Sequence, residues 1–311
     1  MNEATALVSL WAETSIHAGA SSTTGVIDLP IQREGHTGWP CIFGSAVKGA
    51  MRAKAEAIGL GALDVIFGPS PNASAGSEYA GALAVGDARL LLLPVRALTG
   101  HFKWVTCPAL LQRLQRDTQR LGISINLIDG DLSTLTPNSE DTALLPASTN
   151  ARSIDQYLFL EEYRFQTQQV DLSKLIETLT RILGIVDTAA NNPLTKQLCI
   201  VTDERFAFFA QQATPVAPHI AIDNPTKTVR PGALWYEETL PPETILYTTL
   251  HAWPARKNGA SMAAKDILAA VLPATDPSKP ASQLFPTPYL QLGGNETVGM
   301  GWCRLHVITS K

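Results

Sequence analysis

The chain has 311 residues, of which 45% are hydrophobic and 17% are charged, and this composition excludes a disordered protein. The formal net charge of -4 excludes a uniformly basic surface, so a nucleic-acid site would have to be a local patch or form on assembly. The four cysteines form no CxxC pair, which argues against a zinc site and favours a reducing, cytoplasmic location. No apolar run approaches the length of a membrane span, so we expect no membrane partner.

The first third of the chain predicts a strand, a polar loop and a helix, in that order. Residues 6–11 are an apolar run typical of a buried strand, and the following loop is rich in Gly, Ser and Thr. Residues 26–29 are expected to form a short extended piece. Ser45 is a candidate N-cap for a helix with regularly spaced apolar residues that ends at Gly59.

The middle of the chain interleaves strands and helices. Residues 82–85 and 89–95 predict two strands joined at Gly86, after a surface loop at 69–81. We further expect a helix at 108–120, an irregular segment at 123–150, strands at 157–165 and 198–201, and helices at 172–185 and 203–211, the last capped by Asp203.

The last third is mostly extended over 214–249, where Lys227, Arg230 and Gly232 predict a hairpin with a basic tip. A helix at 260–272 and two closing strands at 289–292 and 302–308 are the remaining expected elements. Because strands and helices interleave with many irregular connections, we expect an α+β fold built on an antiparallel sheet.

Residues 15–54 carry the side chains that phosphodiester chemistry needs. The Asp28 carboxylate lies within one short segment of His17, Arg33 and Lys48. Asp28 is suited to bind Mg²⁺, which takes few protein oxygens and keeps several waters. His17 is suited to move a proton, and a nearby cation to neutralise a phosphate oxygen. Each also has a plainer interpretation: Asp28 could cap a turn, His17 could be structural, and Lys48 could be a solvated helix charge.

Five segments together resemble a known family. HAGASSTTGVIDLPIQREGHTGWPCIFGSAVKGAMR is similar to the N-terminal signature of the repeating backbone subunit of the type III-B (Cmr) CRISPR effector, which belongs to the RAMP superfamily. The segments that agree in order are AGALAVGDARLLLLPVRALTGHFKWVTCP, the weaker LFLEEYRF, TKTVRPGALWYEETLP and the glycine-rich LQLGGNETVGMGW.

The resemblance implies a single RAMP domain over 1–311. It implies a ferredoxin-like, RRM-related palm with a helical or irregular insertion at 100–190. It also implies a β-hairpin thumb in the region 214–250. Such subunits bind a CRISPR guide RNA, pair it with single-stranded target RNA, contact other Cmr subunits and stack into a helical filament. They serve antiviral defence as endoribonucleases that cut target RNA at regular intervals with a divalent metal, Mg²⁺ or Mn²⁺.

The resemblance also assigns roles to residues of this chain. Asp28 is the expected catalytic and metal-binding aspartate, His17 the loop histidine, and Glu237 or Glu238 the second acid. The expected RNA-binding residues are Arg33, Lys48, Arg52, Lys227, Arg230, Gly293, Gly294, Gly299 and Gly301. Glu237 and Glu238 could instead lie on the outward face of a strand, and the glycine loop could be a plain turn.

Three other functions compete with this hypothesis. One is a purely structural guide-RNA-packaging subunit without nuclease chemistry. Another is a guide-RNA-processing nuclease that uses histidine acid–base chemistry and no metal. The third is a metabolic enzyme with a nucleotide cofactor, against which the missing dinucleotide fingerprint argues.

Overall fold

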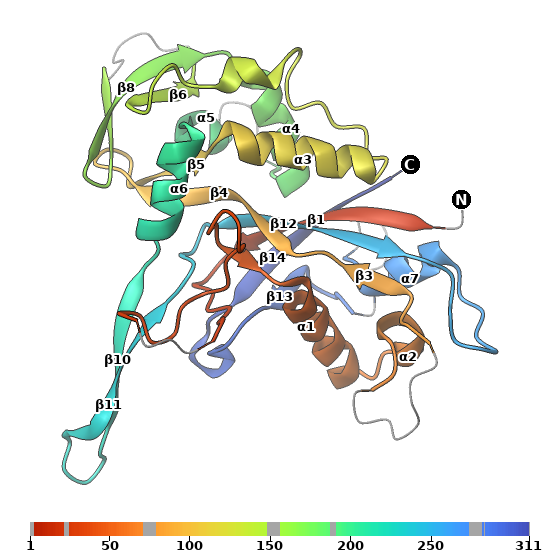
Figure 1. Cartoon of the computed structure of the whole chain (residues 1–311). Helices are drawn as coiled ribbons and strands as arrows, with labels where there is room; N and C mark the ends of the chain where they lie inside the picture. The colour runs from red at the N-terminus through yellow and green to blue at the C-terminus, as the bar shows by residue number, and fades with distance from the viewer. Residues whose placement is uncertain are drawn as a thin grey trace.

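The computed structural model describes most of the chain in one mixed α+β arrangement (Figure 1). The described residues are 3–21, 25–70, 79–147, 156–186, 191–273, 282 and 284–310. The loop predicted at 69–81 and the end of the segment predicted at 123–150 fall partly outside them. No helix in the described ranges is both long enough and apolar enough to span a membrane.

An antiparallel group of strands forms the centre of the sheet. In spatial order these strands are β13 (Tyr289–Gln291), β14 (Trp302–Thr309), β1 (Ala4–Ala12), β12 (Ile245–Ala252) and β4 (Ala88–Arg96). Ala6 pairs with Leu250 on one side, and Val8 pairs with Val307 on the other. β3 (Leu83–Val85) also pairs with β12, so β3 and β4 follow one another along the same edge of β12. The prediction of two strands joined at Gly86 is therefore confirmed. Both strands pair with β12, one after the other.

The sheet continues beyond β4 into strands from the middle of the chain. In spatial order they are β5 (Phe102–Thr106), β9 (Leu198–Ile200), β6 (Thr142–Pro146), β8 (Tyr163–Val170) and β7 (Tyr157–Leu160), while β2 (Cys41–Ile42) pairs with β4. β5 pairs in parallel with β9, and β6 with β8, whereas β4 and β5 are antiparallel.

Helices cover both faces of the central strands (Figure 1). One core contains apolar residues of α1 (Gly44–Ala57), α2 (Leu63–Phe67) and α7 (Ala264–Val271). A second core, on the other face, contains residues of α3 (Pro108–Arg120) and α4 (Ser173–Leu183). The remaining helical elements are α5 (Leu194–Gln197), α6 (Asp203–Gln212), η1 (Leu132–Leu135) and η2 (Glu296–Val298). Successive side chains of a strand point to opposite faces of the sheet, so alternate residues of β12 pack into different cores. Leu250 belongs to the first core and Tyr247 to the second.

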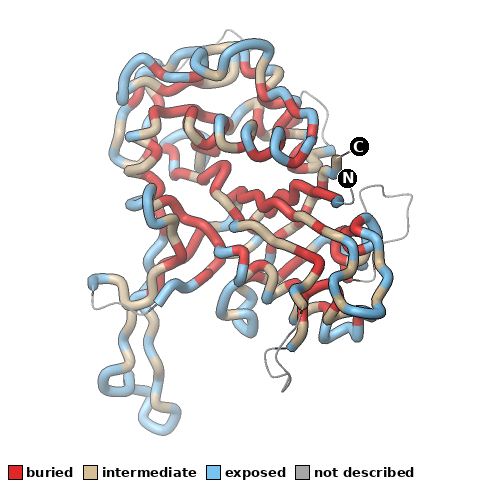
Figure 2. Tube along the Cα trace, turned by 45° about the vertical axis from the view of Figure 1, so that its right-hand side comes forward, coloured by how far each residue is buried: buried red, intermediate tan, exposed pale blue. Residues whose placement is uncertain are grey.

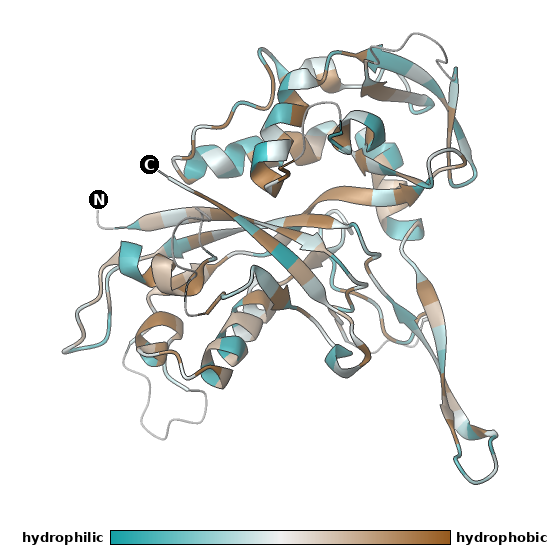
Figure 3. Ribbon diagram, turned by 180° about the vertical axis from the view of Figure 1, so that it is seen from behind, coloured by the Kyte–Doolittle hydropathy of each residue, from teal (hydrophilic) through white to brown (hydrophobic). Residues whose placement is uncertain are grey.

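A two-stranded hairpin projects from this body. It consists of β10 (Val216–Ile222) and β11 (Val229–Glu238), in which Ala217 pairs with Glu237. Figure 2 shows that most of the hairpin is exposed or half-buried, in contrast to the buried strands of the body, whereas Glu237 and Glu238 at its base are buried. Figure 3 shows hydrophobic stretches on it, and Ile222 and Leu234 are both more than half exposed. The predicted hairpin is confirmed.

Several local predictions need correction. α1 begins at Gly44, and Ser45 does not cap it; the Gly44 N–H instead donates to Oδ1 of Asp87, from the turn before β4. The N-cap of α6 is Thr202, while Asp203 accepts a hydrogen bond from the Ala109 N–H at the start of α3. A carboxylate that is remote in sequence therefore caps each of two helices: Asp87 caps α1, and Asp203 caps α3.

Three predicted segments also differ in their backbone. The single strand predicted at 157–165 is instead two strands, β7 and β8, joined by a tight turn with Glu161 in the left-handed region. The segment 26–29 forms no strand, and only Leu29 makes an isolated bridge, to Glu237. The irregular segment predicted at 123–150 contains β6, which pairs with β8.

Candidate active site

The glycine-rich loop between β13 and β14 holds the segment that follows β1. Gly294 donates its N–H to the carbonyl of His17 at 2.9 Å, and Gly301 donates its N–H to the carbonyl of Ser15 at 2.8 Å. Gly293 has φ +85, and a Cβ there would lie 2.3 Å from the His17 carbonyl oxygen. Only glycine permits both this backbone conformation and this approach. The loop therefore fixes the backbone position of His17.

The imidazole of His17 has a defined orientation. Its Nδ1 lies 2.8 Å from the backbone carbonyl of Glu238. A carbonyl can only accept, so Nδ1 carries the proton and Nε2 is the unprotonated nitrogen in the neutral ring. A Cβ on residue 19 would lie 2.9 Å from Nε2, and residue 19 is glycine. Gly19 therefore leaves space in front of the one ring nitrogen that can accept a proton.

The Glu237 carboxylate lies beside this ring. Its Oε1 is 3.9 Å from Nδ1 of His17, and both side chains are largely buried. Nδ2 of Asn295, from the glycine-rich loop, donates to the same Oε1 at 2.5 Å. The sequence did not single out Asn295, whose φ of +61 is one that asparagine tolerates better than most residues. Three segments remote in sequence thus meet at one carboxylate.

Glu238, the alternative acid, has a different environment. Its Oε1 accepts from Nη2 of Arg33 and from Oγ1 of Thr214, and its Oε2 accepts from the Ile31 N–H. Arg33 also donates to the carbonyl of Ala210. The buried Glu238 and the half-buried Arg33 therefore form an ion pair that anchors the base of the hairpin. The geometry leaves Glu237, and not Glu238, facing His17.

Asp28 lies at the same hairpin base. Its Oδ2 accepts a hydrogen bond from the Tyr236 N–H at 2.8 Å, and the Leu29 N–H donates to the Tyr236 carbonyl at 3.1 Å. These two contacts place Asp28 opposite the residue next to Glu237. The Asp28 side chain is half-buried, as a group that receives a ligand from solvent should be.

The predicted cationic residues do not gather at this point. Lys48 donates to the carbonyl of Leu83, and burial, followed by Arg52 and Arg256, lowers the pKa of Lys48. Arg52 pairs with Glu56 and donates to the carbonyl of Gly68. Within the described ranges, no hydrogen bond or ion pair joins Lys48 or Arg52 to Asp28 or His17.

The remaining predicted RNA-binding residues are at the hairpin and in the glycine-rich loop. Lys227 lies in the turn between β10 and β11, and Arg230 lies exposed near the start of β11. Gly299 has φ +83, and a Cβ at this position would meet no atom within 4 Å. The need for glycine at residue 299 therefore comes from its backbone conformation.

The donor set at Asp28 restricts how a metal could bind. In the described part of the chain no three His, Cys, Asp or Glu side chains converge into a metal site. One carboxylate cannot enclose an ion, but Mg²⁺ is commonly held by one or two carboxylates together with phosphate oxygens and water. Asp28 therefore fits a hard divalent ion that is shared with an RNA phosphate.

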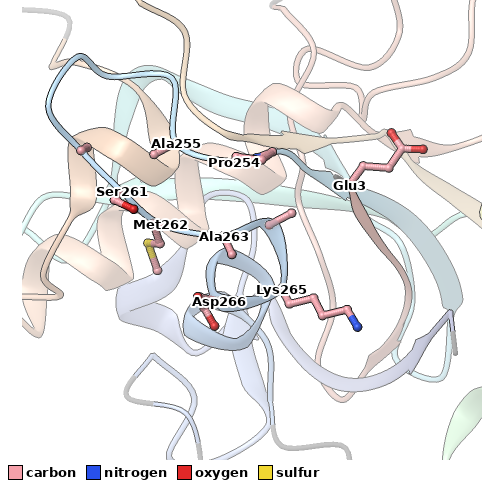
Figure 4. A pocket seen from close by; sticks show the side chains of 10 residues that line it. Glu3, Pro254, Ala255, Ser261, Met262, Ala263, Lys265 and Asp266 are labelled. Carbon is pink, nitrogen blue, oxygen red and sulfur yellow. The ribbon is translucent and has the colours of Figure 1, made fainter. Parts of the chain in front are cut away.

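A separate pocket of about 600 Å³ lies at the start of α7, and it lacks this chemistry. Its lining is mainly small residues between Pro254 and Ala264. Glu3, Lys265 and Asp266 lie apart around it rather than converging (Figure 4). We therefore place the candidate active site at His17, Asp28 and Glu237.

Comparison with known proteins agrees with the sequence resemblance. Residues 10–304 match the family model described as "RAMP superfamily". The chain belongs to the RAMP superfamily. This RAMP protein is 32% identical over 302 residues to a Pyrococcus furiosus protein named "CRISPR system Cmr endoribonuclease Cmr4", covering 96% of this chain and 94% of that protein. It is 26% identical over 306 residues to the Saccharolobus solfataricus "CRISPR system CMR subunit Cmr4", covering 92% and 91%.

Solved structures show the same fold. Oligomeric Cmr4 from Pyrococcus furiosus superposes on this RAMP protein with a TM-score of 0.66 and 25% identity, covering 99% of both chains. A chain of the type III-B Cmr-beta complex bound to cognate target RNA gives 0.68 at 20% identity, with 97% and 96% covered, which supports the fold alone. The family inferred from the five sequence motifs is confirmed.

Proposed function

We propose that this RAMP protein is the guide-RNA-binding subunit and endoribonuclease of a type III-B Cmr effector. The curated relative named as a Cmr endoribonuclease supports this assignment. The observation that carries it here is the His17 ring, whose Nδ1 is bound to the Glu238 carbonyl so that Nε2 is the accepting nitrogen. The buried Glu237 carboxylate lies beside this ring, and Asp28 lies at the same hairpin base.

The proposed chemistry uses the 2′-hydroxyl of the target RNA as nucleophile. The protein needs only to hold the 2′-oxygen, the phosphorus and the leaving 5′-oxygen in line. Nε2 of His17 accepts the 2′-hydroxyl proton, while Nδ1–H stays bonded to the Glu238 carbonyl. The Glu237 carboxylate stabilises the imidazolium, which then returns its proton to the leaving oxygen. The products are a 2′,3′-cyclic phosphate and a 5′-hydroxyl.

Asp28 is the residue that would hold a divalent ion, Mg²⁺ or Mn²⁺, together with the scissile phosphate. Such an ion neutralises charge that develops on the phosphate oxygens. The chain's own contribution is the fixed position of the carboxylate, which the Tyr236 N–H holds at the hairpin base.

The architecture supports a ferredoxin-like palm. The elements follow the order β1, α1, β3 and β4, β12, α7, β14, which is β-α-β-β-α-β, and the spatial order is β14-β1-β12-β4 with all neighbours antiparallel. The hairpin is the proposed thumb, with Lys227 and Arg230 positioned to contact an RNA backbone. Its exposed Ile222 and Leu234 favour contact with a partner, including further copies stacked in a filament.

Analysis of the cleavage products by the assembled, guide-loaded complex tests this function. We expect a 2′,3′-cyclic phosphate end, and no cleavage where the scissile nucleotide is 2′-deoxy. A 3′-hydroxyl end would refute attack by the 2′-oxygen. Cleavage that persists in EDTA would favour the metal-free histidine scheme, and no cleavage by intact complex would favour the purely structural subunit.

A further inference from the structure

A row of aromatic and guanidinium groups lies at the far end of β12 from the candidate active site. His251 and Trp253 are alternate residues on one face, and their rings stack with centroids 6.1 Å apart and an interplanar angle of 20°. The Arg256 guanidinium lies over the Trp253 ring at 4.6 Å. Nη1 of Arg120 lies 3.1 Å from Nε2 of His251. We call Arg120, His251, Trp253 and Arg256 the cationic ladder.

A cavity of about 240 Å³ adjoins the ladder. Arg89, Arg120, Thr249 and His251 line it, together with residues 84–87. The Arg89 and Arg120 side chains are 38% and 53% exposed, so part of each guanidinium fork faces solvent. This is a concave site lined by two guanidinium groups and the His251 ring.

Two acidic neighbours of this cavity, Asp87 and Asp117, have partners within the chain, and a third acid, Glu3, lies near His251. Asp117 is buried and accepts from Nη1 of Arg89 and from the Tyr247 hydroxyl, both at 2.8 Å. Asp87 accepts from the Gly44 N–H at the start of α1. Among the described residues, Arg120 contacts His251 at 3.1 Å, Thr249 at 3.3 Å and Asp117 at 3.5 Å. A ligand with phosphate oxygens would therefore give Arg120 stronger hydrogen bonds than it has within the chain.

Further cations lie on α1, on the other side of the sheet from α3. Arg256 is close enough to Lys48 to contribute to the lowered pKa of that lysine, after burial and Arg52. α1 and α3 lie on opposite sides of the sheet (Figure 1). Cations therefore occur on both sides of the sheet here, with Lys48 on α1 and Arg120 at the end of α3.

We infer that the cationic ladder and its cavity bind single-stranded RNA at a surface separate from the active site. Stacked aromatic rings interleaved with guanidinium groups bind bases and phosphates of any sequence. The site is remote, because β12 extends from Ile245 to Ala252 and so separates it from the active site by about 23 Å. The inference rests on the proposed function only in taking RNA as the ligand.

Binding of a labelled oligouridine to the full chain at low salt tests the inference. We expect Trp253→Ala and Arg120→Gln each to weaken binding about tenfold. Arg120→Gln should also reduce the slope of log affinity against log salt by about one. Arg256→Lys, which keeps the charge but loses the planar stacking group, should weaken binding less than Arg256→Ala. Unchanged affinity in all of these variants would overturn the inference.

The chain offers a matched control in Arg164, which lies over the Tyr157 ring at 4.8 Å on the β7–β8 hairpin. Arg164→Ala and Tyr157→Ala should leave RNA binding unchanged, and equal losses there would refute a specific role for the ladder. Binding of a polyglutamate peptide with the same dependence on Arg120 and Trp253 would show an acidic-protein surface instead.

A second measurement identifies which RNA occupies the site. In the guide-loaded complex, ultraviolet cross-linking with either the guide or the target labelled should give an adduct at Trp253 or His251 with one strand. No adduct with either strand would overturn the inference. Asp28→Asn should leave this adduct and the oligouridine affinity intact, so loss of cleavage and loss of ladder binding are separate outcomes.

Discussion

Nδ1 of His17 lies 2.8 Å from the Glu238 carbonyl and 3.9 Å from the Glu237 carboxylate, so two consecutive residues at the hairpin base orient one imidazole. The backbone of Glu238 selects the tautomer, and the side chain of Glu237 supplies negative charge. The two neighbouring acids therefore have different functions, because strand geometry points their side chains in opposite directions.

This difference predicts opposite outcomes for two similar substitutions. Glu237→Gln should lower the single-turnover cleavage rate by about 100-fold with little change in melting temperature, because it removes charge beside His17. Glu238→Gln should lower the free energy of unfolding by about 3 kcal/mol, because Arg33 would lose its buried partner. Cleavage kinetics and urea unfolding of both variants test this. The reverse pattern would assign the catalytic acid to Glu238.

Asn295 is predicted to position the Glu237 carboxylate. Asn295→Gly keeps the left-handed backbone but removes the amide, so we expect cleavage to fall about tenfold while RNA affinity stays unchanged. Gln291→Ala is the control, because Gln291 supports the same loop through the carbonyls of Gly293 and Met300 but does not contact Glu237. Combined with Glu237→Gln, the Asn295 change should add little further loss. Equal losses in the Gln291 variant would mean that only loop structure matters.

Gly19 is predicted to keep Nε2 of His17 accessible. Gly19→Ala places a methyl group 2.9 Å from Nε2, and the ring cannot turn away without losing its bond to Glu238. We expect cleavage to fall about tenfold or more, since a misplaced catalytic group is costly. Gly35→Ala is the matched control, because no atom lies within 4 Å of the added methyl. Wild-type cleavage by the Gly19 variant would exclude Nε2 as the proton acceptor.

Stability should fall as the pH is lowered below about 6.5. Burial lowers the pKa of His306, and the nearby Arg304 adds to this shift, while the hydrogen bond of His306 to the Ile182 carbonyl opposes it. Burial also lowers the pKa of His251. The unfolded chain therefore binds more protons in this range, and stability that is complete at higher pH is lost on acidification. Urea unfolding from pH 7.5 to 5.5 should show a shallower loss for His306→Asn than for the wild type. An equal loss in the His306 variant and the wild type would contradict this account.

The sequence predicted the elements whose signal is local. The apolar run of β1, the periodic α1 and α3 and the basic hairpin were all found. The turn at Glu161 was missed because it lacks glycine, although its φ is positive. The caps supplied by Asp87 and Asp203 were missed because each carboxylate acts on a helix elsewhere in the chain.

The sequence predicted which residues form the candidate site, but it could not predict how these residues are arranged around His17. Family motifs named His17, Asp28 and the Glu237–Glu238 pair, but only tertiary structure could show which acid faces the histidine. Asn295 had no local signal, because its role depends on a contact with a residue on another strand. Arg33 was expected to bind RNA, yet its guanidinium is bonded to Glu238 and the Ala210 carbonyl.

The most direct test of the proposed site is the single-turnover cleavage rate of guide-loaded complex containing Asp28→Asn. We predict at least a 100-fold loss of target cleavage, with assembly and target affinity equal to those of the wild type. Cleavage at the wild-type rate by this variant would contradict the placement of the reaction at the hairpin base.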